Sequence, residues 1–332
     1  MQVVVTGGAG MLGKKLVKAI LKKGTLAGKD GNQVKVDKIQ VLDVVPSGNL
    51  TAADLPNDPR VSYTQGEVYD AGLMKKLIAP GTGSVFHFAA IVSAGAEADT
   101  DLGYRVNLDG TRVVLDACRA LGSTPRVVFT SSVAVYGGEM PAVIPDDFPL
   151  RPQTSYGSQK AMGELLLNDY TRKGFIDGRA LRLPTIVVRP GKPNLAASTF
   201  ASSIIREPLS GQEAVCPVDP KTMMPLLSPR KTIEAFLRAH DLPGSAWGSN
   251  RALHLPSLDI SVTEMAEGLK KVAGADAYNR IKWQIEPRIQ AIVATWPGRL
   301  SSARARAMGF ESDASVEAII NAFLEDDLRP NG

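Results

Sequence analysis

A tyrosine and a lysine stand four positions apart, at Tyr156 and Lys160, in a stretch whose pattern predicts a helix over residues 155–173. Residues four apart lie on the same face of a helix, so the two side chains would be neighbours. Free tyrosine has a pKa of about 10 and is a poor base at neutral pH. A nearby ammonium stabilises the phenolate, and the pair could then exchange a proton with a substrate oxygen.

Two hydroxyl side chains, Ser131 and Ser132, follow an apolar strand-like run over residues 127–130. Ligands of open α/β sheets bind beyond the carboxyl ends of the strands. Ser132 could therefore donate a hydrogen bond to the substrate oxygen whose proton Tyr156 takes. The alternative is that both serines only form a turn or a helix cap.

A glycine-rich turn lies between a strand-like run over residues 3–5 and a helix-like stretch over residues 11–23. Its glycines form two overlapping spacings, G-x-x-G-x-x-G and G-x-G-x-x-G. Such glycines allow a tight turn, close approach of a pyrophosphate to the backbone and close helix–strand packing. The pyrophosphate binds at the helix N-terminus, unless the turn is purely structural. The expected contacts are Gly7, Gly10, Met11, Leu12 and Gly13.

The same loop nearly matches the phosphate-binding pattern G-x-x-x-x-G-K-[ST], through Gly8, Gly13 and Lys14. Lys15 stands where that pattern needs a hydroxyl to hold Mg²⁺, which disfavours an ATPase or a kinase. A dinucleotide site is therefore the preferred interpretation of the loop.

The second strand-like run, over residues 39–42, ends at Asp43. An acidic residue here binds the ribose hydroxyls of a dinucleotide and repels a 2′-phosphate, which favours NAD over NADP. Asp43 lies 30 residues after Gly13, whereas the usual gap is about 20. Residues 25–36 are predicted to form an inserted loop or hairpin that accounts for the excess. An ordinary strand-end cap is the alternative for Asp43.

Short apolar runs alternate with amphipathic stretches through the first half of the chain. The predicted strands are residues 3–5, 39–42, 61–64, 85–88, 127–130 and 179–188, and the predicted helices are residues 11–23, 71–78, 104–121 and 155–173. Continuous apolar strands separated by helices are typical of a buried parallel sheet with right-handed crossovers. The prediction is an α/β fold with a Rossmann-type doubly wound parallel sheet.

The second half of the chain has a different composition, because prolines are frequent in residues 184–229. Helix-like stretches return at residues 228–239, 262–272 and 315–325. We expect a smaller mixed C-terminal substrate lobe here. The expected division is residues 1–183 as the NAD-binding Rossmann domain that carries the serine, tyrosine and lysine. Residues 184–332 would mostly form the substrate-binding lobe, with the chain crossing back to the sheet.

The composition excludes several other classes of protein. The 332 residues carry 38 basic and 34 acidic side chains without long runs, so no nucleic-acid partner is expected. Cys118 and Cys216 are far apart and the three histidines lack ligand spacing, so no disulfide framework and no metal are expected. No apolar run reaches the roughly 18–20 residues that cross a bilayer, and the N-terminus is unlike a signal peptide. We expect a cytoplasmic protein without membrane contact.

Five motifs, spread in order over nearly the whole chain, resemble the extended short-chain dehydrogenase/reductase family. They are T-G-G-x-G-x-x-G at 6–13, H-x-A-A at 87–90, Y-x-x-N-x-x-G-T at 104–111, S-S-x-x-V-Y-G at 131–137 and Y-x-x-x-K at 156–160. The resemblance implies that Tyr156 is the catalytic acid/base and that Lys160 lowers its pKa and holds the nicotinamide ribose. It implies that Ser132 orients the reacting oxygen. It also implies a homodimer through four-helix packing of the helices at 104–121 and 155–173.

The resemblance covers the rest of the cofactor site as well. Glu67 and Val68 stand where the family contacts adenine, although aspartate is usual in place of Glu67. The other contacts implied along the cofactor are Ala89, Ala90, Asn107 and Leu183. Asn107 would act through the backbone of its helix, and His87 is expected to be a strand residue rather than a catalytic group.

Residues 182–194, with the sequence R-L-P-T-I-V-V-R-P-G-K-P-N, differ from the family's epimerases, which usually carry an aromatic residue or Asn before Gly-Pro here. The segment is similar instead to sugar-acid dehydrogenases of the family. That resemblance implies NAD-dependent oxidation of D-erythronate at C2 to 2-oxo-erythronate, in sugar-acid catabolism. One alternative is a nucleotide-sugar epimerase or dehydratase with tightly bound NAD. Another is a non-catalytic NAD sensor, a class that commonly lacks the tyrosine or the lysine.

A sugar acid needs a cation for its carboxylate and polar groups for its hydroxyls. Arginine is the best bidentate partner of a carboxylate. The candidates are Arg189 and Arg206, with Arg230 as a third, although each could instead form a surface ion pair. The expected hydroxyl partners, besides Ser132 and Tyr156, are Ser93, Thr185, Asn194 and Ser202, of which Ser93 is favoured.

Overall fold

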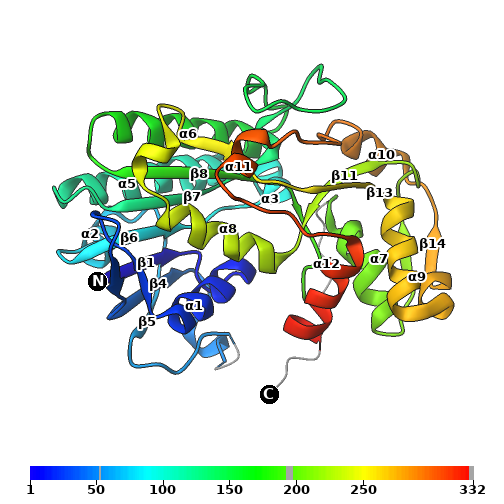
Figure 1. Cartoon of the computed structure of the whole chain (residues 1–332), viewed down its shortest axis with the longest axis horizontal. Coiled ribbons are helices and arrows are strands. Elements are labelled where there is room, and N and C mark those ends of the chain that lie inside the picture. Colours follow the sequence, from blue (N-terminus) through cyan, green and yellow to red (C-terminus); the bar gives the residue numbers. More distant parts are fainter. Residues whose placement is uncertain (52–53, 192–196, 329–332) are drawn as a thin grey trace. The chain divides into compact units, whose positions relative to one another are not determined.

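The structure is a computed structural model of the whole chain, and it describes residues 1–51, 54–191 and 197–328. The chain folds into two compact units, each of which is described by itself (Figure 1). The first unit contains residues 1–135, 154–182 and 233–253. The second unit contains residues 136–153, 183–232 and 254–332.

A seven-stranded sheet forms the centre of the first unit. Its strands are β1 (Gln2–Thr6), β4 (Lys38–Asp43), β5 (Val61–Gln65), β6 (Thr82–His87), β7 (Arg126–Ser132), β8 (Asp177–Leu183) and β12 (Ala252–His254). The order across the sheet is β12-β8-β7-β6-β1-β4-β5, and the pairs from β7 to β5 run parallel. Because the strand order reverses between β1 and β6, this is a doubly wound sheet. The predicted α/β Rossmann-type fold is confirmed.

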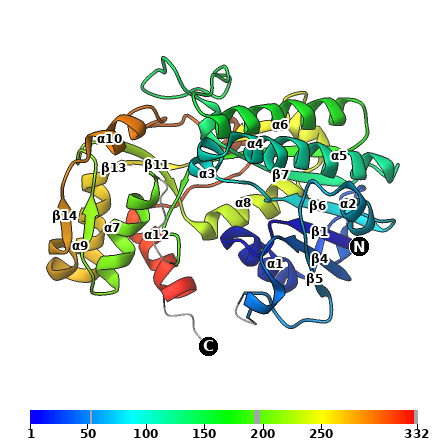
Figure 2. The same cartoon turned by 180° about the vertical axis from the view of Figure 1, so that it is seen from behind.

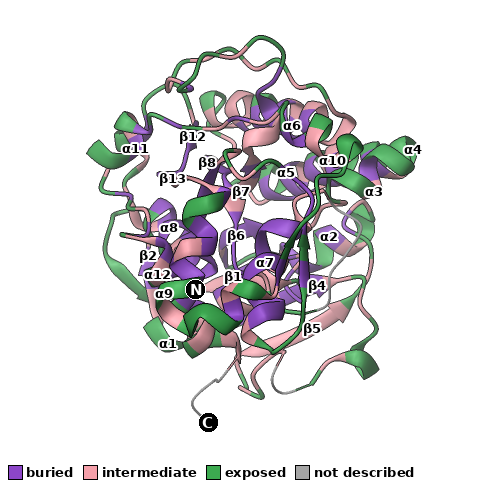
Figure 3. Ribbon diagram, turned by 90° about the vertical axis from the view of Figure 1, so that its right-hand side faces the viewer, coloured by how far each residue is buried: buried purple, intermediate pink, exposed green. Residues whose placement is uncertain are grey.

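Helices cover both faces of this sheet. They are α1 (Met11–Lys23), α2 (Ala71–Leu77), α3 (Ser93–Ala98), α4 (Thr100–Tyr104), α5 (Gly110–Ala120), α6 (Ser155–Arg172) and the end of α8 (Pro229–Asp241). Figure 2 shows α5 and α6 on one side of the sheet and α1 on the other. Apolar side chains of α5 and α6, such as Leu115 and Leu167, pack against Val85 and Phe129 of the strands. As a result β6 is buried along most of its length (Figure 3).

Two details of the first unit differ from the sequence prediction or refine it. The predicted insertion is a hairpin of β2 (Thr25–Ala27) and β3 (Gln33–Lys35), which is confirmed. The predicted helix over residues 104–121 begins earlier, with α4, and passes through a π-helical turn (Arg105–Asp109) into α5. π-Helical turns are rare and often occur at functional sites.

The prediction of one strand over residues 179–188 is wrong. β8 ends at Leu183, and the next strand, β9 (Thr185–Ile186), pairs with β11 (Met223–Leu227) in a different sheet. Pro184 lies between them and has no backbone N–H to donate to a strand ladder, so the strand stops there.

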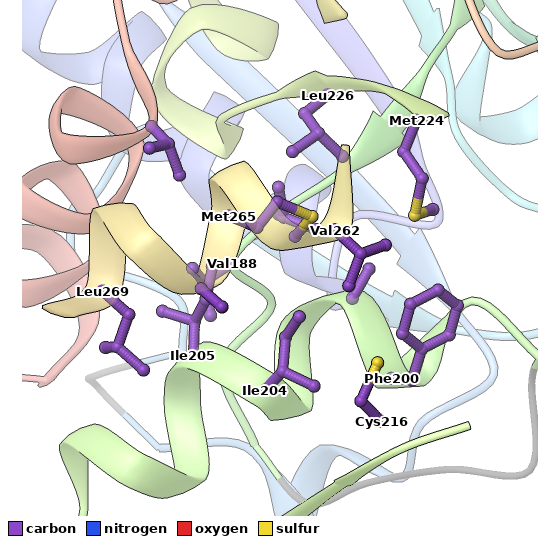
Figure 4. Close-up of a cluster of buried hydrophobic side chains, with 14 of the residues drawn as sticks. Val188, Phe200, Ile204, Ile205, Cys216, Met224, Leu226, Val262, Met265 and Leu269 are labelled. Carbon is purple, nitrogen blue, oxygen red and sulfur yellow. The ribbon is translucent and has the colours of Figure 1, made fainter. Parts of the chain in front are cut away.

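The second unit is a smaller mixed α/β arrangement. A three-stranded sheet joins β9, β11 and β13 (Leu258–Ser261), and β10 (Ala214–Cys216) pairs with β14 (Ile281–Trp283). Its helices are α7 (Thr199–Leu209), α9 (Val262–Asn279), α10 (Pro287–Val293), α11 (Ala303–Ala307) and α12 (Val316–Phe323). Ile204 and Ile205 of α7 pack with Val262, Met265 and Leu269 of α9 in its core (Figure 4).

Two histidines of the first unit are wholly enclosed. His240 of α8 lies 2.6 Å from the Ser84 hydroxyl through Nε2 and 2.9 Å from Asp241 through Nδ1. Burial lowers the pKa of His240 to about 4, although Asp241 opposes the shift. Burial, together with the charge of Lys160, lowers the pKa of His87 to about 3. Both imidazoles are therefore neutral in the folded protein at physiological pH.

We expect the free energy of unfolding to decrease as the pH falls from about 6.5 towards 4. Both histidines take up a proton near pH 6.5 in the unfolded chain but not in the folded one, so acid stabilises the unfolded state. Each histidine should account for about 2 kcal/mol between pH 7 and pH 5. Urea unfolding at these two pH values measures the effect, and His240→Gln should reduce it by about half. Equal free energies of unfolding at both pH values would contradict the prediction.

Candidate active site

The glycine loop between β1 and α1 leaves no room for side chains. Gly7 has a φ of +70°, and a Cβ there would lie 2.5 Å from the Ala89 nitrogen. A Cβ on Gly13 would lie 2.4 Å from the carbonyl oxygen of Gly7. Gly10 precedes α1, and no side chain caps the amides of the first turn, where Met11 and Leu12 lie. A bare backbone cradle at a helix N-terminus fits the pyrophosphate of a dinucleotide.

The carboxylate of Asp43 is fixed beside this loop. One oxygen, Oδ2, accepts a hydrogen bond from the Ala9 amide at 2.9 Å, and Oδ1 accepts one from the Val44 amide at 2.8 Å. The second of these bonds is the strand-end cap that was the alternative for Asp43. The first ties the carboxylate to the glycine loop, which places its charge at the carboxyl edge of β1 and β4.

The remaining predicted cofactor residues follow the carboxyl ends of neighbouring strands. Glu67 and Val68 come after β5, where Glu67 is exposed and Val68 is buried. Ala89 and Ala90 come after β6 and are half-buried. Since ligands of such sheets bind where the strand order reverses, the region beyond β1 and β6 is the expected place. Leu183 closes β8 and is buried.

The side chain of Asn107, in the π-helical turn, is fully occupied with structural bonds. Its Oδ1 accepts from the Ile91 amide at 2.8 Å, and its Nδ2 donates to the Ile91 carbonyl at 2.9 Å and to Gln159 Oε1 at 2.7 Å. These bonds hold the segment after β6 against α6. Gln159 was not singled out by the motifs, and nothing in the local sequence signals its bond to Asn107.

Helix α6 brings Tyr156 and Lys160 together. Thr154 caps the helix by accepting from the Gly157 amide at 3.0 Å. Lys160 is buried, with its Nζ 5.7 Å from the centre of the Tyr156 ring and 4.8 Å from that of Phe129. Burial lowers the pKa of Lys160 to about 7, and the negative charge of Glu164 opposes this shift. A lysine so placed can stabilise a phenolate on its neighbour.

Ser132 ends β7 and is half-buried. Its Oγ accepts a hydrogen bond from the Ala134 amide at 3.1 Å, which leaves the hydroxyl proton for donation to another oxygen. Ser131 differs, because its hydroxyl donates to the buried carboxylate of Glu164. Of the two serines, Ser132 is therefore the one suited to bind a substrate oxygen.

The residues predicted to bind substrate lie in different surroundings. Ser93 opens α3 in the first unit and is exposed, and Thr185 is half-buried in β9 of the second unit. Asn194 lies outside the described residues. Ser202 Oγ accepts from the Arg189 amide.

The three candidate arginines already have partners. Arg189 donates to the Ile186 carbonyl and to Ser198. Arg206 pairs with Glu207 at 2.6 Å in a buried ion pair. Arg230 pairs with Glu325 and Asp326 at the surface. A surface ion pair was the alternative for each arginine, and the structure shows one for Arg230, whereas the ion pair of Arg206 is buried.

The described part of the chain shows neither a metal cluster nor a membrane span. No three His, Cys, Asp or Glu side chains among the described residues gather as metal ligands. Within residues 1–51, 54–191 and 197–328, no helix is long and apolar enough to cross a membrane. Cys118 and Cys216 are buried free thiols.

Comparison with known proteins decides the family. The sequence model of the NAD dependent epimerase/dehydratase family matches residues 3–248. The chain belongs to this family. An NAD-type cofactor is therefore supported for this member of the NAD dependent epimerase/dehydratase family, in agreement with the bare cradle of the glycine loop.

Several members of the family are similar over nearly their whole length. D-erythronate dehydrogenase of Cupriavidus necator is 52% identical over 326 residues, which are 98% of each chain. D-erythronate dehydrogenase of Haemophilus influenzae is 44% identical over 329 residues, 99% of this chain and 100% of the relative. A crystal structure described as a nucleoside-diphosphate-sugar epimerase from Agrobacterium tumefaciens is 41% identical, with a TM-score of 0.91. It is matched over 100% of this chain and 95% of its own.

Proposed function

We propose that the chain is an NAD-dependent dehydrogenase that oxidises D-erythronate at C2 to 2-oxo-erythronate, in sugar-acid catabolism. The observation that carries the proposal is the similarity to two proteins named D-erythronate dehydrogenase, at 52% and 44% identity over almost the whole chain. The placement of Lys160 beside Tyr156 on α6 supports it, because oxidation of an alcohol requires a base for the hydroxyl proton.

In this proposal Ser132 donates a hydrogen bond to the reacting hydroxyl oxygen, and Tyr156 removes the hydroxyl proton. Lys160 keeps Tyr156 ready to accept that proton, since a neighbouring ammonium stabilises the phenolate. Hydride acceptance is the chemistry that a bound nicotinamide dinucleotide supplies. The protein contributes orientation and the path of the proton.

The proposed cofactor is NAD, held by the residues predicted from the sequence. The glycine loop would bind the pyrophosphate, Asp43 the adenine ribose and Lys160 the nicotinamide ribose. The remaining proposed contacts are Glu67, Val68, Ala89, Ala90, Asn107 and Leu183. Asn107 would contribute only its backbone, because its side chain already bonds to Ile91 and Gln159.

The second unit is proposed as the substrate-binding lobe, within residues 184–332. Thr185 and Asn194, with Ser93 of the first unit, are the proposed partners of the hydroxyls. Arg189 and Arg206 are the proposed partners of the carboxylate. Arg206 would have to share its guanidinium between Glu207 and the substrate.

One assay separates the proposal from its main alternative. A dehydrogenase given D-erythronate and NAD should produce reduced nicotinamide, seen as a rise in near-ultraviolet absorbance, together with 2-oxo-erythronate. The alternative is a nucleotide-sugar epimerase, which the description of the Agrobacterium structure favours. An epimerase would interconvert two sugars with no net reduction of the dinucleotide. No absorbance change with erythronate, together with turnover of a nucleotide sugar, would refute the proposal.

We expect Asp43→Asn to reduce the preference for NAD over NADP by about 10- to 100-fold, measured as the ratio of the two kcat/KM values. A hydrogen bond to a charged group is worth about 1.5–3 kcal/mol, and the substitution also removes the repulsion of a 2′-phosphate. With its oxygen towards Ala9, asparagine keeps the bond to the glycine loop and loses the one from the Val44 amide. An unchanged ratio would show that Asp43 is only a strand-end cap.

We also propose a homodimer in the cytoplasm, formed by packing α5 and α6 of two copies as a four-helix bundle. Leu165 of α6, a large apolar side chain that is 67% exposed in the single chain, would be covered in such a bundle. Light scattering should give twice the mass of one chain, and Leu165→Asp should give the monomer mass. A wild-type protein with the mass of one chain would contradict the proposal.

A further inference from the structure

A buried carboxylate, Glu164, lies one helical turn beyond Lys160 on α6. Tyr156, Lys160 and Glu164 follow one another at intervals of four and so share one face of the helix. Glu164 is only 4% exposed, which is rare for a glutamate unless it is paired. Its partner is Arg182 of β8, whose Nε and Nη2 donate to the two carboxylate oxygens at 2.9 and 2.7 Å.

A second bond connects this carboxylate to the strand that carries Ser132. Ser131, near the end of β7, donates its hydroxyl proton to Glu164 Oε1. The neighbouring residue is Ser132, which ends the strand. One carboxylate therefore fixes both the end of β7 and the helix face that carries Tyr156 and Lys160.

Stability alone does not account for the Glu164–Arg182 pair. Replacing a buried ion pair by apolar side chains of similar volume is often neutral or stabilising, because the pair must be removed from water. The position of Lys160 suggests a function for the Glu164–Arg182 pair. Its ammonium is enclosed by the rings of Phe129 and Tyr156, and burial of this kind disfavours the charged form.

The groups packed near Lys160 come from several elements, and most of them carry no charge. The β6 side contributes His87, which is neutral, and β7 contributes the uncharged Phe129 and Ser131. Arg182 of β8 is paired with Glu164, and the charge that acts on Lys160 is that of Glu164. Glu164 is therefore the negative charge of this group, and its field favours the ammonium form of Lys160.

We propose that Glu164 is a positioning residue for proton transfer, whose carboxylate, held by Arg182 and Ser131, keeps Lys160 in its ammonium form beside Tyr156. The inference rests on the proposed roles of Tyr156 and Lys160. It implies that the charges of Glu164 and Arg182 shift the pKa of Lys160, and with it the pH range of activity, in opposite directions. Loss of the glutamate charge removes the negative group that favours the ammonium form of Lys160, whereas loss of the arginine charge leaves that carboxylate without its positive partner and has the reverse effect.

The test compares Glu164→Gln with Arg182→Gln in the full chain. The titration of Lys160 is followed by NMR of lysine labelled at Cε, with the resonance assigned by its loss in Lys160→Met. We expect the midpoint to move down by about one pH unit in Glu164→Gln and up by a smaller amount in Arg182→Gln. The alkaline limb of kcat/KM for D-erythronate, where Lys160 loses its proton, should move in the same opposite directions.

Destabilisation would act on both variants alike and would not shift the titration in opposite directions. Asp177→Asn is the matched control, since Asp177 forms another ion pair on β8, with Arg179. It should lower stability and leave the Lys160 midpoint in place. If Glu164→Gln does not fold, the double variant Glu164→Gln/Arg182→Gln removes both buried charges and should show a smaller downward shift.

Shifts of the same sign in both single variants, or no shift in Glu164→Gln and none in the double variant, would overturn the inference. The NMR titration needs no substrate, so it also separates this inference from the proposed function. Opposite midpoint shifts in a protein that does not oxidise D-erythronate would support the role of Glu164 and refute the substrate. Turnover of D-erythronate with the alkaline limb at the same pH in both variants would support the substrate and refute the role of Glu164.

Discussion

Tyr156→Phe should fold, bind an NAD-type cofactor with nearly unchanged affinity and lose about 10³-fold in kcat. The substitution removes one hydroxyl from a half-buried ring on α6 and leaves the helix cap at Thr154 and the neighbouring Lys160 in place. A positioned acid/base contributes roughly 10²- to 10⁴-fold to the rate, and Tyr156 carries its phenol on the ring that lies 5.7 Å from Lys160 Nζ. Steady-state kinetics and a cofactor titration measure the two effects separately.

The same helix offers a matched control. Tyr170 lies on α6, and its hydroxyl donates to Asp116 at 2.8 Å. Tyr170→Phe removes an identical group, so it should reduce the free energy of unfolding by about 1 kcal/mol without changing kcat. A Tyr156→Phe protein with kcat within tenfold of the wild type would show that another group takes the proton.

Gly13→Ala should weaken cofactor binding by at least about 100-fold, because the new methyl group has no place in the loop. Its Cβ would lie 2.4 Å from the Gly7 carbonyl oxygen and 2.5 Å from the Gly8 Cα, and both contacts are with backbone. The loop must open to relieve them, and opening displaces the amides that would bind the pyrophosphate. Fluorescence titration with the dinucleotide measures the loss.

Gly48→Ala is the control for this substitution. Gly48 lies in a short 3₁₀ turn (Ser47–Asn49) after β4, and a Cβ there meets nothing within 4 Å. Binding of the cofactor also raises the melting temperature of a protein that binds it only in the folded state. That rise should be present in wild type and in Gly48→Ala and absent in Gly13→Ala. Equal rises in all three would mean that the cofactor binds away from the loop.

The first unit was predictable because its signals are local. The apolar run at residues 3–5 and the glycines after it indicate a buried strand and a tight turn, whatever the rest of the chain contains. The hairpin at residues 25–36 was predicted because the distance from the glycines to Asp43 is longer than usual. The strand over residues 179–188 was predicted wrongly because its apolar pattern continues through Pro184, whereas the backbone pairing changes there. The periodicity of apolar residues indicates which residues are buried, but it does not indicate which sheet they join.

The structural roles of Glu164 and Gln159 were not predictable for a related reason. A glutamate four residues after a lysine on a helix is typical of a solvent-exposed pair, and nothing in the local sequence reveals that α6 is covered on this face by β7 and β8. Arg182 reaches Glu164 from a strand 18 residues further along the chain. Likewise, Asn107 was expected from its motif, but its bond to Gln159 spans 52 residues and depends on how two helices pack.

Helix α8 begins in the second unit and ends in the first, where residues 233–253 also supply β12 to the edge of the sheet. The second unit of such a chain is not a module that a single recombination event could exchange. A gene fusion after residue 183 would remove the last strand and the helix that carries His240. We therefore expect members of this family to acquire new substrates by point substitutions and loop changes within residues 183–232 and 254–332, with α8 and β12 inherited alongside the sheet.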